Sequence, residues 1–308
     1  NRIAGVILNN CSEGMYAIYK NLLEENGIKA YGYLPKVPEA SIGSRHLGLV
    51  TAEEISDIKK KMDLLGKAAE KSLDLDGIMK LGEGAETLEH EDLTILRGRD
   101  ESSVKIGIAR DKAFCFYYED VLEMLEDLGA RLIPFSPVED EHLPCGINGL
   151  ILGGGYPELH IEKISQNKSM LNEIKKASED EMPIYAECGG FMYLGESIEI
   201  SGKKYKTVGA IKGNSRVTKS LVRFGYKDLE ANVDNVLCRK GESIRCHEFH
   251  YSDTDNYGTG FTASNGRGRT WLTGKATKSM YAGYPHLHLW GNPGFAKSFI
   301  EACEMYGR

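Results

Sequence analysis

The chain has 308 residues, of which 41% are hydrophobic and 27% are charged, and its formal net charge is −7. A chain of this length and composition is typically a globular protein of about two domains. The acidic balance argues against general nucleic-acid binding, which needs a concentrated basic face. The sequence has no signal-peptide pattern and no apolar run long enough to cross a membrane, so we expect neither export nor membrane insertion.

Seven cysteines are scattered along the chain without a Cys-x-x-Cys pair. Their odd number and irregular spacing argue against a zinc ribbon and against a disulfide framework. Free thiols are typical of a reducing compartment. We therefore expect a cytoplasmic protein, and we predict no metal site.

The first part of the chain alternates between strand-like and helical patterns. The predicted elements are strands at 3–8 and 29–34 and helices at 13–26 and 52–73. This order indicates a βαβ unit, that is, a parallel sheet covered by helices. Because the chain starts at Asn1 and enters a strand almost at once, we expect it to open part-way through its first domain.

A polar segment with weak periodicity follows. We interpret residues 83–102 as a linker between a first domain at 1–82 and a second domain at 103–308. In the second domain we predict strands at 105–109, 131–135, 149–152 and 184–186 and helices at 116–128, 158–177 and 293–306. Residues 198–290 contain shorter strand-like pieces and turns. Both domains are therefore predicted to be of the α/β class.

Cys188 is the most informative residue of the chain. The apolar strand at 184–186 leads through Glu187 to Cys188, which two glycines and an apolar helix start follow. This is the layout of a nucleophile elbow, in which a reactive side chain stands on a sharp strand-to-helix turn. A thiol there lies near a helix N-terminus, whose partial positive charge favours the thiolate. A buried structural cysteine is the alternative interpretation.

A glycine-rich loop at 153–155 comes directly after a predicted strand. In an open α/β sheet the carboxyl ends of the strands form the ligand crevice, so this loop and the elbow should face one cavity. Backbone N–H groups of such a loop can stabilise an oxyanion, and one donor contributes about 2.7–4 kcal/mol. An ordinary tight turn is the alternative.

Histidines near the end of the chain are candidate partners of the thiol. The segment 284–289 alternates like a strand, which would put His286 and His288 on one face. Histidine is the usual base for a cysteine nucleophile. His247 belongs to the segment 245–252, whose histidine spacing does not match the zinc-protease motif His-Glu-x-x-His. Core histidines and a metal site are the alternatives, and the metal is disfavoured because no acidic or cysteine ligand cluster lies nearby in the sequence.

Taken together, these segments resemble the cobyrinic acid a,c-diamide synthase family, whose glutaminase half is a class I glutamine amidotransferase domain. The resemblance is carried by the segments 153–158, 186–194, 218–226, 245–252 and 284–288. Upstream, the segments 5–10, 32–36 and 44–50 resemble the second half of the family's ATP-binding domain, which is similar to dethiobiotin synthetase. The resemblance implies the C-terminal part of a P-loop-type α/β domain followed by a flavodoxin-like amidotransferase domain.

The resemblance also implies roles for single residues. Cys188 would attack the side-chain amide of glutamine, giving a γ-glutamyl thioester and ammonia. His286 would raise the nucleophilicity of the thiol and protonate the leaving ammonia. The oxyanion hole would be formed by backbone N–H groups around Gly154, Gly155 and Gly189. In the intact enzyme ATP and Mg²⁺ would activate substrate carboxylates, which the ammonia would convert to amides.

The chain departs from the family pattern in two places. Most class I amidotransferases carry a glutamate two residues after the histidine, where this chain has His288, so the sequence supports a Cys–His dyad and leaves the third member open. The motif Gly-x-x-x-x-Gly-Lys-Ser/Thr is absent, and phosphate binding depends on that loop. We therefore expect this chain alone to act as a glutaminase and to bind neither ATP nor Mg²⁺.

The resemblance further implies a polycarboxylated tetrapyrrole as substrate, a missing N-terminal P-loop segment and a homodimer. The candidate contacts with nucleotide or substrate are Asn9, Asn10, Arg45, His46, Arg216 and His247. A basic cluster of Lys212, Arg216, Lys219 and Arg223 could pair with substrate carboxylates, although charged runs are more often solvated surface. Strand-end caps and a solvated loop are the corresponding alternatives for the N-terminal residues.

Other functions share part of these features. A nickel-sirohydrochlorin a,c-diamide synthase would carry the same motifs. A stand-alone Cys–His hydrolase on the same fold would explain the elbow but would leave the first domain without a role. A binding module would retain the fold without needing the nucleophile, the glycine loop and the histidine together.

Overall fold

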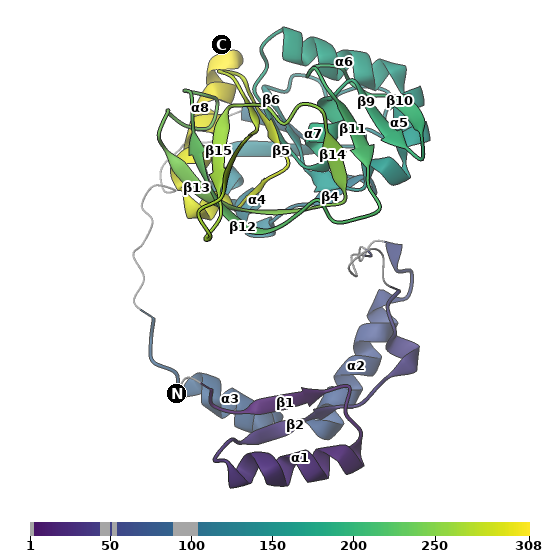
Figure 1. Cartoon of the computed structure of the whole chain (residues 1–308), viewed down its shortest axis with the longest axis vertical. Helices are drawn as coiled ribbons and strands as arrows, with labels where there is room; N and C mark the ends of the chain where they lie inside the picture. Colours follow the sequence, from purple (N-terminus) through teal and green to yellow (C-terminus); the bar gives the residue numbers. More distant parts are fainter. Residues whose placement is uncertain (1–2, 44–49, 51–53, 89–103) are drawn as a thin grey trace. The chain divides into compact units, whose positions relative to one another are not determined.

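The computed structural model describes residues 3–43, 50, 54–88 and 104–308. The chain divides into two compact units, Asn1–Asp92 and Leu93–Arg308 (Figure 1). Most of the predicted linker at 83–102 lies outside the described residues. No helix in the described part of the chain combines the length and the apolar character that a membrane span requires.

The first unit is built on a pair of parallel strands, as the βαβ pattern predicts. β1 (Val6–Asn9) pairs in parallel with β2 (Ala30–Leu34), and α1 (Glu13–Glu25) connects them. The hydroxyl of Ser12 caps α1 by accepting from the Met15 N–H. The remaining helices of this unit are η1 (Pro38–Ala40), α2 (Ile58–Ser72) and α3 (Leu75–Glu83).

The helix predicted at 52–73 corresponds to α2, which begins only at Ile58, and the following helix α3 was not predicted. Leu73 is extended because it forms a bridge with Gly32 of β2, and the Asp74 N–H donates to the Tyr31 carbonyl at 2.8 Å. The Asp74 carboxylate then caps α3 by accepting from the Gly77 N–H at 2.9 Å. Pairing with the sheet therefore separates the two helices.

The second unit is centred on a six-stranded sheet with the order β17-β18-β8-β6-β3-β5, in which all neighbours are parallel except β17 and β18. Its strands are β3 (Val104–Ala109), β5 (Ala130–Phe135), β6 (Gly149–Leu152), β8 (Ile184–Glu187), β17 (Lys275–Ala276) and β18 (Met280–Gly283). The predicted α/β class is confirmed.

Helices cover this sheet on both faces (Figure 1). They are α4 (Glu119–Asp127), η4 (Pro157–Leu159), α5 (Ile161–Gln166), α6 (Lys168–Glu179), α7 (Gly189–Leu194), η5 (Leu289–Gly291) and α8 (Pro293–Tyr306). One hydrophobic cluster joins the sheet to α4 and α8, and another joins it to α5, α6 and α7. Burial of these apolar faces is the main stabilising contribution of such a layered domain.

Residues after α7 form additional antiparallel layers. The five-stranded sheet has the order β16-β15-β12-β13-β19, and the four-stranded sheet has the order β10-β9-β11-β14. Their strands are β9 (Ser197–Ile200), β10 (Lys203–Lys206), β11 (Asn214–Val217), β12 (Arg223–Ala231), β13 (Ser243–His250), β14 (Ser252–Thr254), β15 (Phe261–Ser264), β16 (Thr270–Thr273) and β19 (His286–Leu287).

Two predicted helices of the second unit differ from the observed ones. The helix expected at 116–128 begins only at Glu119, because β4 (Phe114–Phe116) pairs with β7 (Gly154–Gly155). The helix expected at 158–177 is interrupted at Asn167, whose side chain accepts from the Met170 N–H at the start of α6. The same side chain donates to the Pro137 and Asp140 carbonyls, so tertiary hydrogen bonds fix the interruption.

Candidate active site

Three loops that follow neighbouring parallel strands meet at one edge of the six-stranded sheet. Cys188 follows β8, the glycine loop follows β6, and the segment leading to His286 follows β18. Because the strands are parallel, their carboxyl ends lie at the same edge, which is where ligands bind in this class of sheet.

Cys188 stands at a sharp turn between β8 and α7. Its φ of 45° and ψ of −99° are rare for a residue that is not glycine, so the turn is strained. The Cys188 N–H donates to the Gly283 carbonyl at 2.7 Å, and its own carbonyl accepts from the Met192 N–H at 3.0 Å. These bonds hold the turn in place, and the Cys188 side chain is 8% exposed.

The glycines beside Cys188 allow the two loops to touch. A Cβ on Gly189 would lie 2.9 Å from the ring of Pro157 and 3.2 Å from the backbone nitrogen of Gly155. A Cβ on Gly190 would collide with the Leu152 carbonyl. The start of α7 therefore packs directly on the glycine loop, which needs residues without side chains.

The glycine loop also touches the histidine. A Cβ on Gly154 would lie 2.6 Å from Cε1 of His286. Gly155 has a φ of 154°, and a Cβ there would collide with the Ala113 carbonyl. The structure thus brings the loop, the elbow and His286 to one place.

His286 lies beside both Cys188 and Glu187. Its Nδ1 is 3.2 Å from Oε2 of Glu187, and Cys188 lies close enough to raise the pKa of the ring. Burial by itself would lower the pKa of His286, but the hydrogen bonds and charges of Cys188 and Glu187 outweigh it and raise that pKa to about 10. A protonated imidazole beside the sulfur is therefore favoured at neutral pH.

Glu187 is the residue that the sequence analysis missed. Its side chain is 8% exposed, and its second oxygen, Oε1, accepts from the Leu287 N–H at 2.7 Å and from the Tyr185 hydroxyl. A carboxylate in an otherwise apolar buried strand was the available signal, because such a charge is costly unless it is paired.

His288 does not share the environment of His286, so the prediction that both lie on one strand face is wrong. β19 contains only His286 and Leu287, and the chain then enters η5. His288 Nε2 lies 3.2 Å from Oδ2 of Asp120 on α4, and the His288 side chain is 42% exposed. The position that carries glutamate in most class I amidotransferases therefore faces α4 here.

Two further predicted binding residues, His247 and Arg216, lie on strands of the antiparallel sheets. His247 is opposite His286 in the β13–β19 pair, and burial lowers the pKa of His247. Arg216 on β11 is 64% exposed and forms an ion pair of 2.5 Å with Asp253.

The predicted residues of the N-terminal part lie in the first unit or outside the described residues. Asn9 is the last residue of β1, and Asn10 follows it with a positive φ of 57°. Arg45 and His46 lie outside the described residues. Within the described ranges, no group of three or more His, Cys, Asp or Glu side chains could hold a metal ion.

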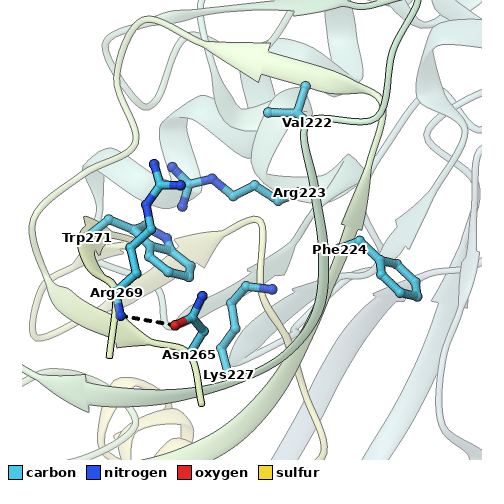
Figure 2. Close-up of a pocket in the computed structure, with 7 residues that line it drawn as sticks. All are labelled: Val222, Arg223, Phe224, Lys227, Asn265, Arg269 and Trp271. Carbon is cyan, nitrogen blue, oxygen red and sulfur yellow. Dashed lines mark hydrogen bonds between the residues drawn. The ribbon is translucent and has the colours of Figure 1, made fainter. Parts of the chain in front are cut away.

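A cationic hollow of about 250 Å³ opens between β12 and β16 (Figure 2). It is lined by Val222, Arg223, Phe224, Lys227, Asn265, Arg269 and Trp271. In Figure 2 the guanidinium groups of Arg223 and Arg269 extend toward one another beside Trp271, while Phe224 points away. The guanidinium of Arg223 lies 4.7 Å from the ring centres of both Tyr257 and Trp271.

Comparison with known proteins assigns the chain to a family. Residues 105–294 match the CobB/CobQ-like glutamine amidotransferase domain. The chain is 41% identical to a cobyrinate a,c-diamide synthase of Caldanaerobacter subterraneus over 313 residues, which cover 99% of this chain and 68% of the relative. It is 42% identical over 305 residues to one of Clostridium tetani, which covers 97% of this chain and 68% of that relative. The chain belongs to the cobyrinate a,c-diamide synthase family.

The predicted resemblance to this family is confirmed. As a member of the cobyrinate a,c-diamide synthase family, the chain contains the glutamine amidotransferase portion of a ligase. The names of the relatives do not favour a nickel-sirohydrochlorin synthase or a stand-alone hydrolase. Among solved structures, the chain is similar to PurLQS from Thermotoga maritima, with a TM-score of 0.45 and 17% identity over 67% of this chain and 99% of that chain.

Proposed function

We propose that the second unit hydrolyses glutamine through Cys188 and supplies the ammonia for amidation of the a and c carboxylates of a cobyrinate-type tetrapyrrole. The observation that carries this proposal is the proximity of Cys188 and His286 at the glycine loop. A nucleophile, a base and adjacent backbone donors are the parts that acyl transfer requires.

The first half of the reaction forms a thioester. The sulfur of Cys188 attacks the carboxamide carbon of glutamine, and the resulting oxyanion accepts hydrogen bonds from backbone N–H groups around Gly154, Gly155 and Gly189. His286 donates its proton to the leaving nitrogen as the C–N bond breaks, so ammonia departs and a γ-glutamyl thioester remains.

The second half regenerates the enzyme. Neutral His286 takes a proton from water while the oxygen attacks the thioester carbon, and the C–S bond then breaks. Glutamate leaves, and Cys188 and protonated His286 are restored. The raised pKa of His286 supports this cycle, because the resting imidazole already carries the proton that the leaving nitrogen needs.

ATP and Mg²⁺ belong to the amidation half of the proposal. The sequence has no P-loop motif, and the described residues offer no carboxylate cluster for a cation. The described residues therefore do not fit the phosphates of ATP or Mg²⁺, and no step above uses these groups. Asn9 and Asn10 remain proposed nucleotide contacts only.

The tetrapyrrole is proposed as substrate because the relatives are named for it. Arg216 is a proposed contact for its carboxylates, although the residue would first have to exchange Asp253 for the substrate. His247 is proposed to border the same site, since it is opposite His286. A cytoplasmic location and a homodimer complete the proposal.

Covalent labelling tests the glutaminase function directly. The full chain is treated with 6-diazo-5-oxo-L-norleucine, a glutamine analogue that alkylates a glutamine-attacking thiol, and the modified residue is mapped by mass spectrometry. We expect modification of Cys188 and a fall in ammonia release of at least about 10³-fold in Cys188→Ala. Cys145→Ala is the matched control, because Cys145 is an exposed free thiol that the mechanism does not use.

The rate of ammonia release and the rate at which Cys188 is labelled can differ. A glutaminase site can be slow without a loaded synthetase partner, whereas labelling needs only a competent thiol. Failure to modify Cys188 while another cysteine reacts, or full ammonia release by Cys188→Ala, would contradict the proposal.

A further inference from the structure

Both carboxylate oxygens of Glu187 contact the segment that carries His286. Oε2 lies 3.2 Å from Nδ1 of His286, and Oε1 accepts from the N–H of Leu287, the next residue, at 2.7 Å. One carboxylate therefore contacts both the ring and the backbone of β19. A buried carboxylate with this set of partners is paired rather than left uncompensated.

Glu187 is itself held in place by Tyr185. The Tyr185 hydroxyl donates to Oε1, and the Tyr185 ring stacks on Tyr281, with ring centres 5.6 Å apart, and packs at 6.0 Å from Phe299. Burial raises the pKa of Tyr185, so the hydroxyl stays a proton donor across the working pH range. The carboxylate is thus fixed before any substrate binds.

This arrangement commits one of the two ring nitrogens of His286 to the carboxylate. With Nδ1 facing Glu187, the other ring nitrogen is left for Cys188. The position two residues after His286 cannot provide this function, since His288 faces Asp120 instead.

We propose that Glu187 is the positioning residue of the site, which orients His286 and compensates its positive charge from the residue immediately before the nucleophile. The proposal rests on the glutaminase function above. It places the acid of the site on β8, whereas most class I amidotransferases carry it after the histidine.

Substitution of the carboxylate by its amide tests this role in the full chain. In Glu187→Gln we expect kcat for glutamine hydrolysis to fall by about 10²- to 10⁴-fold with KM changed by no more than about twofold. The alkaline limb of the kcat/KM profile should move to lower pH by about one pH unit, because loss of the negative charge lowers the pKa of His286. Other titratable groups near His286 are Cys188, His247, Glu248 and His250, and the variant leaves them unchanged.

Asp120→Asn is the matched control, because Asp120 contacts His288 and not His286. Its kcat should stay within about twofold of the wild-type value. Tyr185→Phe is a second variant that keeps the carboxylate but removes the hydroxyl that fixes it, and we expect a smaller loss of kcat.

Different results would contradict the positioning role of Glu187 and the glutaminase function. A Glu187→Gln protein with unchanged kcat, or with reduced kcat and an unmoved alkaline limb, would overturn the positioning role. If Glu187→Gln does not fold, an unchanged kcat in Tyr185→Phe would overturn it. A wild-type chain whose Cys188 does not react with the glutamine analogue would instead contradict the glutaminase function itself.

The cationic hollow of Figure 2 contains buried hydrogen-bond donors that have no partner among the described residues. Nη1 of Arg223 and Nε1 of Trp271 are buried and have no hydrogen-bond partner within the described part of the chain. The Arg223 guanidinium is held between the rings of Tyr257 and Trp271, so its direction is fixed. Lys227 forms an ion pair with Glu248 at 3.4 Å, and the charge of Arg223 also acts on this buried carboxylate, although no ion pair of Arg223 itself is found within the described part of the chain.

The chemistry of these groups selects an anion. Guanidinium and indole N–H groups only donate hydrogen bonds, so the ligand must accept them. Arginine binds planar carboxylates through two parallel bonds, and Arg269 converges on the same space in Figure 2. We infer that the hollow binds a carboxylate. The proposed function offers two sources, the α-carboxylate of glutamine and a carboxylate of the tetrapyrrole.

Two alkylating agents distinguish these sources in the full chain. The norleucine analogue carries an α-carboxylate and iodoacetamide carries none. If glutamine is the source, Arg223→Met should slow labelling of Cys188 by the norleucine analogue by about tenfold or more and leave labelling by iodoacetamide unchanged. If the tetrapyrrole is the source, both labelling rates stay unchanged and cobyrinate binding, measured by isothermal titration, weakens by about tenfold or more.

Arg245→Met is the matched control, because Arg245 is exposed and already paired with Asp228. Unchanged labelling together with unchanged cobyrinate binding in Arg223→Met would overturn the carboxylate site. Arg223→Lys retains the positive charge but lacks the two parallel donors, so it should weaken labelling or binding less than Arg223→Met does. It also provides a test if Arg223→Met does not fold. Absence of analogue labelling in the wild type would count against the glutaminase function, while the titration would still test the hollow.

Discussion

At the scale of single residues, the candidate site combines a local motif with one distant partner. Cys188 could be predicted because the strand, the thiol and the two glycines are consecutive in the sequence. Glu187 could not be given a role in the same way, because its partner His286 is 99 positions away. Only the pairing of β18 with β8, which leads the chain back to this edge of the sheet, brings the two together.

His250 is a second buried histidine with a different environment. Its ring stacks on Tyr284, with the centres 3.9 Å apart and an angle of 8° between the planes, and its Nδ1 lies 2.7 Å from the Ser252 carbonyl. Burial lowers the pKa of His250 to about 4, and the nearby charge of Arg223 adds to this. His250 is therefore neutral in the folded protein at neutral pH.

The neutral state of His250 predicts a loss of stability in acid. As the pH falls below about 6.5, the unfolded chain binds a proton that the folded protein accepts only near pH 4, so the free energy of unfolding decreases across this range. A pKa displacement of this size corresponds to roughly 3 kcal/mol in the free energy of unfolding. Urea unfolding between pH 7 and pH 4 should show a steeper decrease for the wild type than for His250→Phe.

His142→Gln is the control for this experiment. Its hydrogen bond with Glu173 raises the pKa of His142, so this exposed residue titrates above the acid range and its removal should leave the acid slope unchanged. Parallel slopes for the wild type and His250→Phe would contradict the assignment of the acid sensitivity to His250.

At the scale of elements, local patterns predicted the elements of the described parallel sheets well and the interruptions poorly. The strands around β8 and the final helix α8 could be predicted because apolar periodicity and terminal signals such as Asn292 and Pro293 lie within the element itself. The break at Asn167 depends on hydrogen bonds to segments elsewhere in the chain, which no local window contains.

The short strand β19 shows the same dependence. Alternation along 284–289 would place His286 and His288 on one face only if the strand continued. It ends at Leu287 because η5 follows, with the Gly291 N–H donating to the His288 carbonyl at 2.8 Å. The turn redirects His288 toward α4 and separates the two histidines chemically.

At the scale of the whole molecule, the two units differ in how much apolar surface they bury. Among the described residues of the first unit, the buried hydrophobic side chains are Ala30, Tyr31 and Ala40. The second unit contains extensive hydrophobic clusters on both faces of its sheet, formed from its own residues. Burial of apolar area is the dominant stabilising contribution, so the second unit should be stable by itself.

Separate expression of the units tests this expectation. Residues 104–308 should unfold cooperatively and keep the reaction of Cys188 with the glutamine analogue, while residues 1–92 alone should show marginal stability. Circular dichroism melting and mass spectrometry of the labelled protein provide the measurements. An unfolded 104–308 fragment, or a folded one whose Cys188 no longer reacts, would show that the first unit contributes to the site.

The sequence by itself determined the α/β class, the nucleophile elbow at Cys188, the glycine loop and the resemblance to the diamide synthase family. Each of these depends on residues that are close together in the chain, where periodicity, turn chemistry and motif spacing act directly. The tertiary structure alone decided that Glu187 faces His286, that His288 turns toward Asp120, and that Arg223 lines a cationic hollow. The physical reason is that burial and pairing of charges depend on which strands become neighbours, and strand pairing joins residues that the sequence separates.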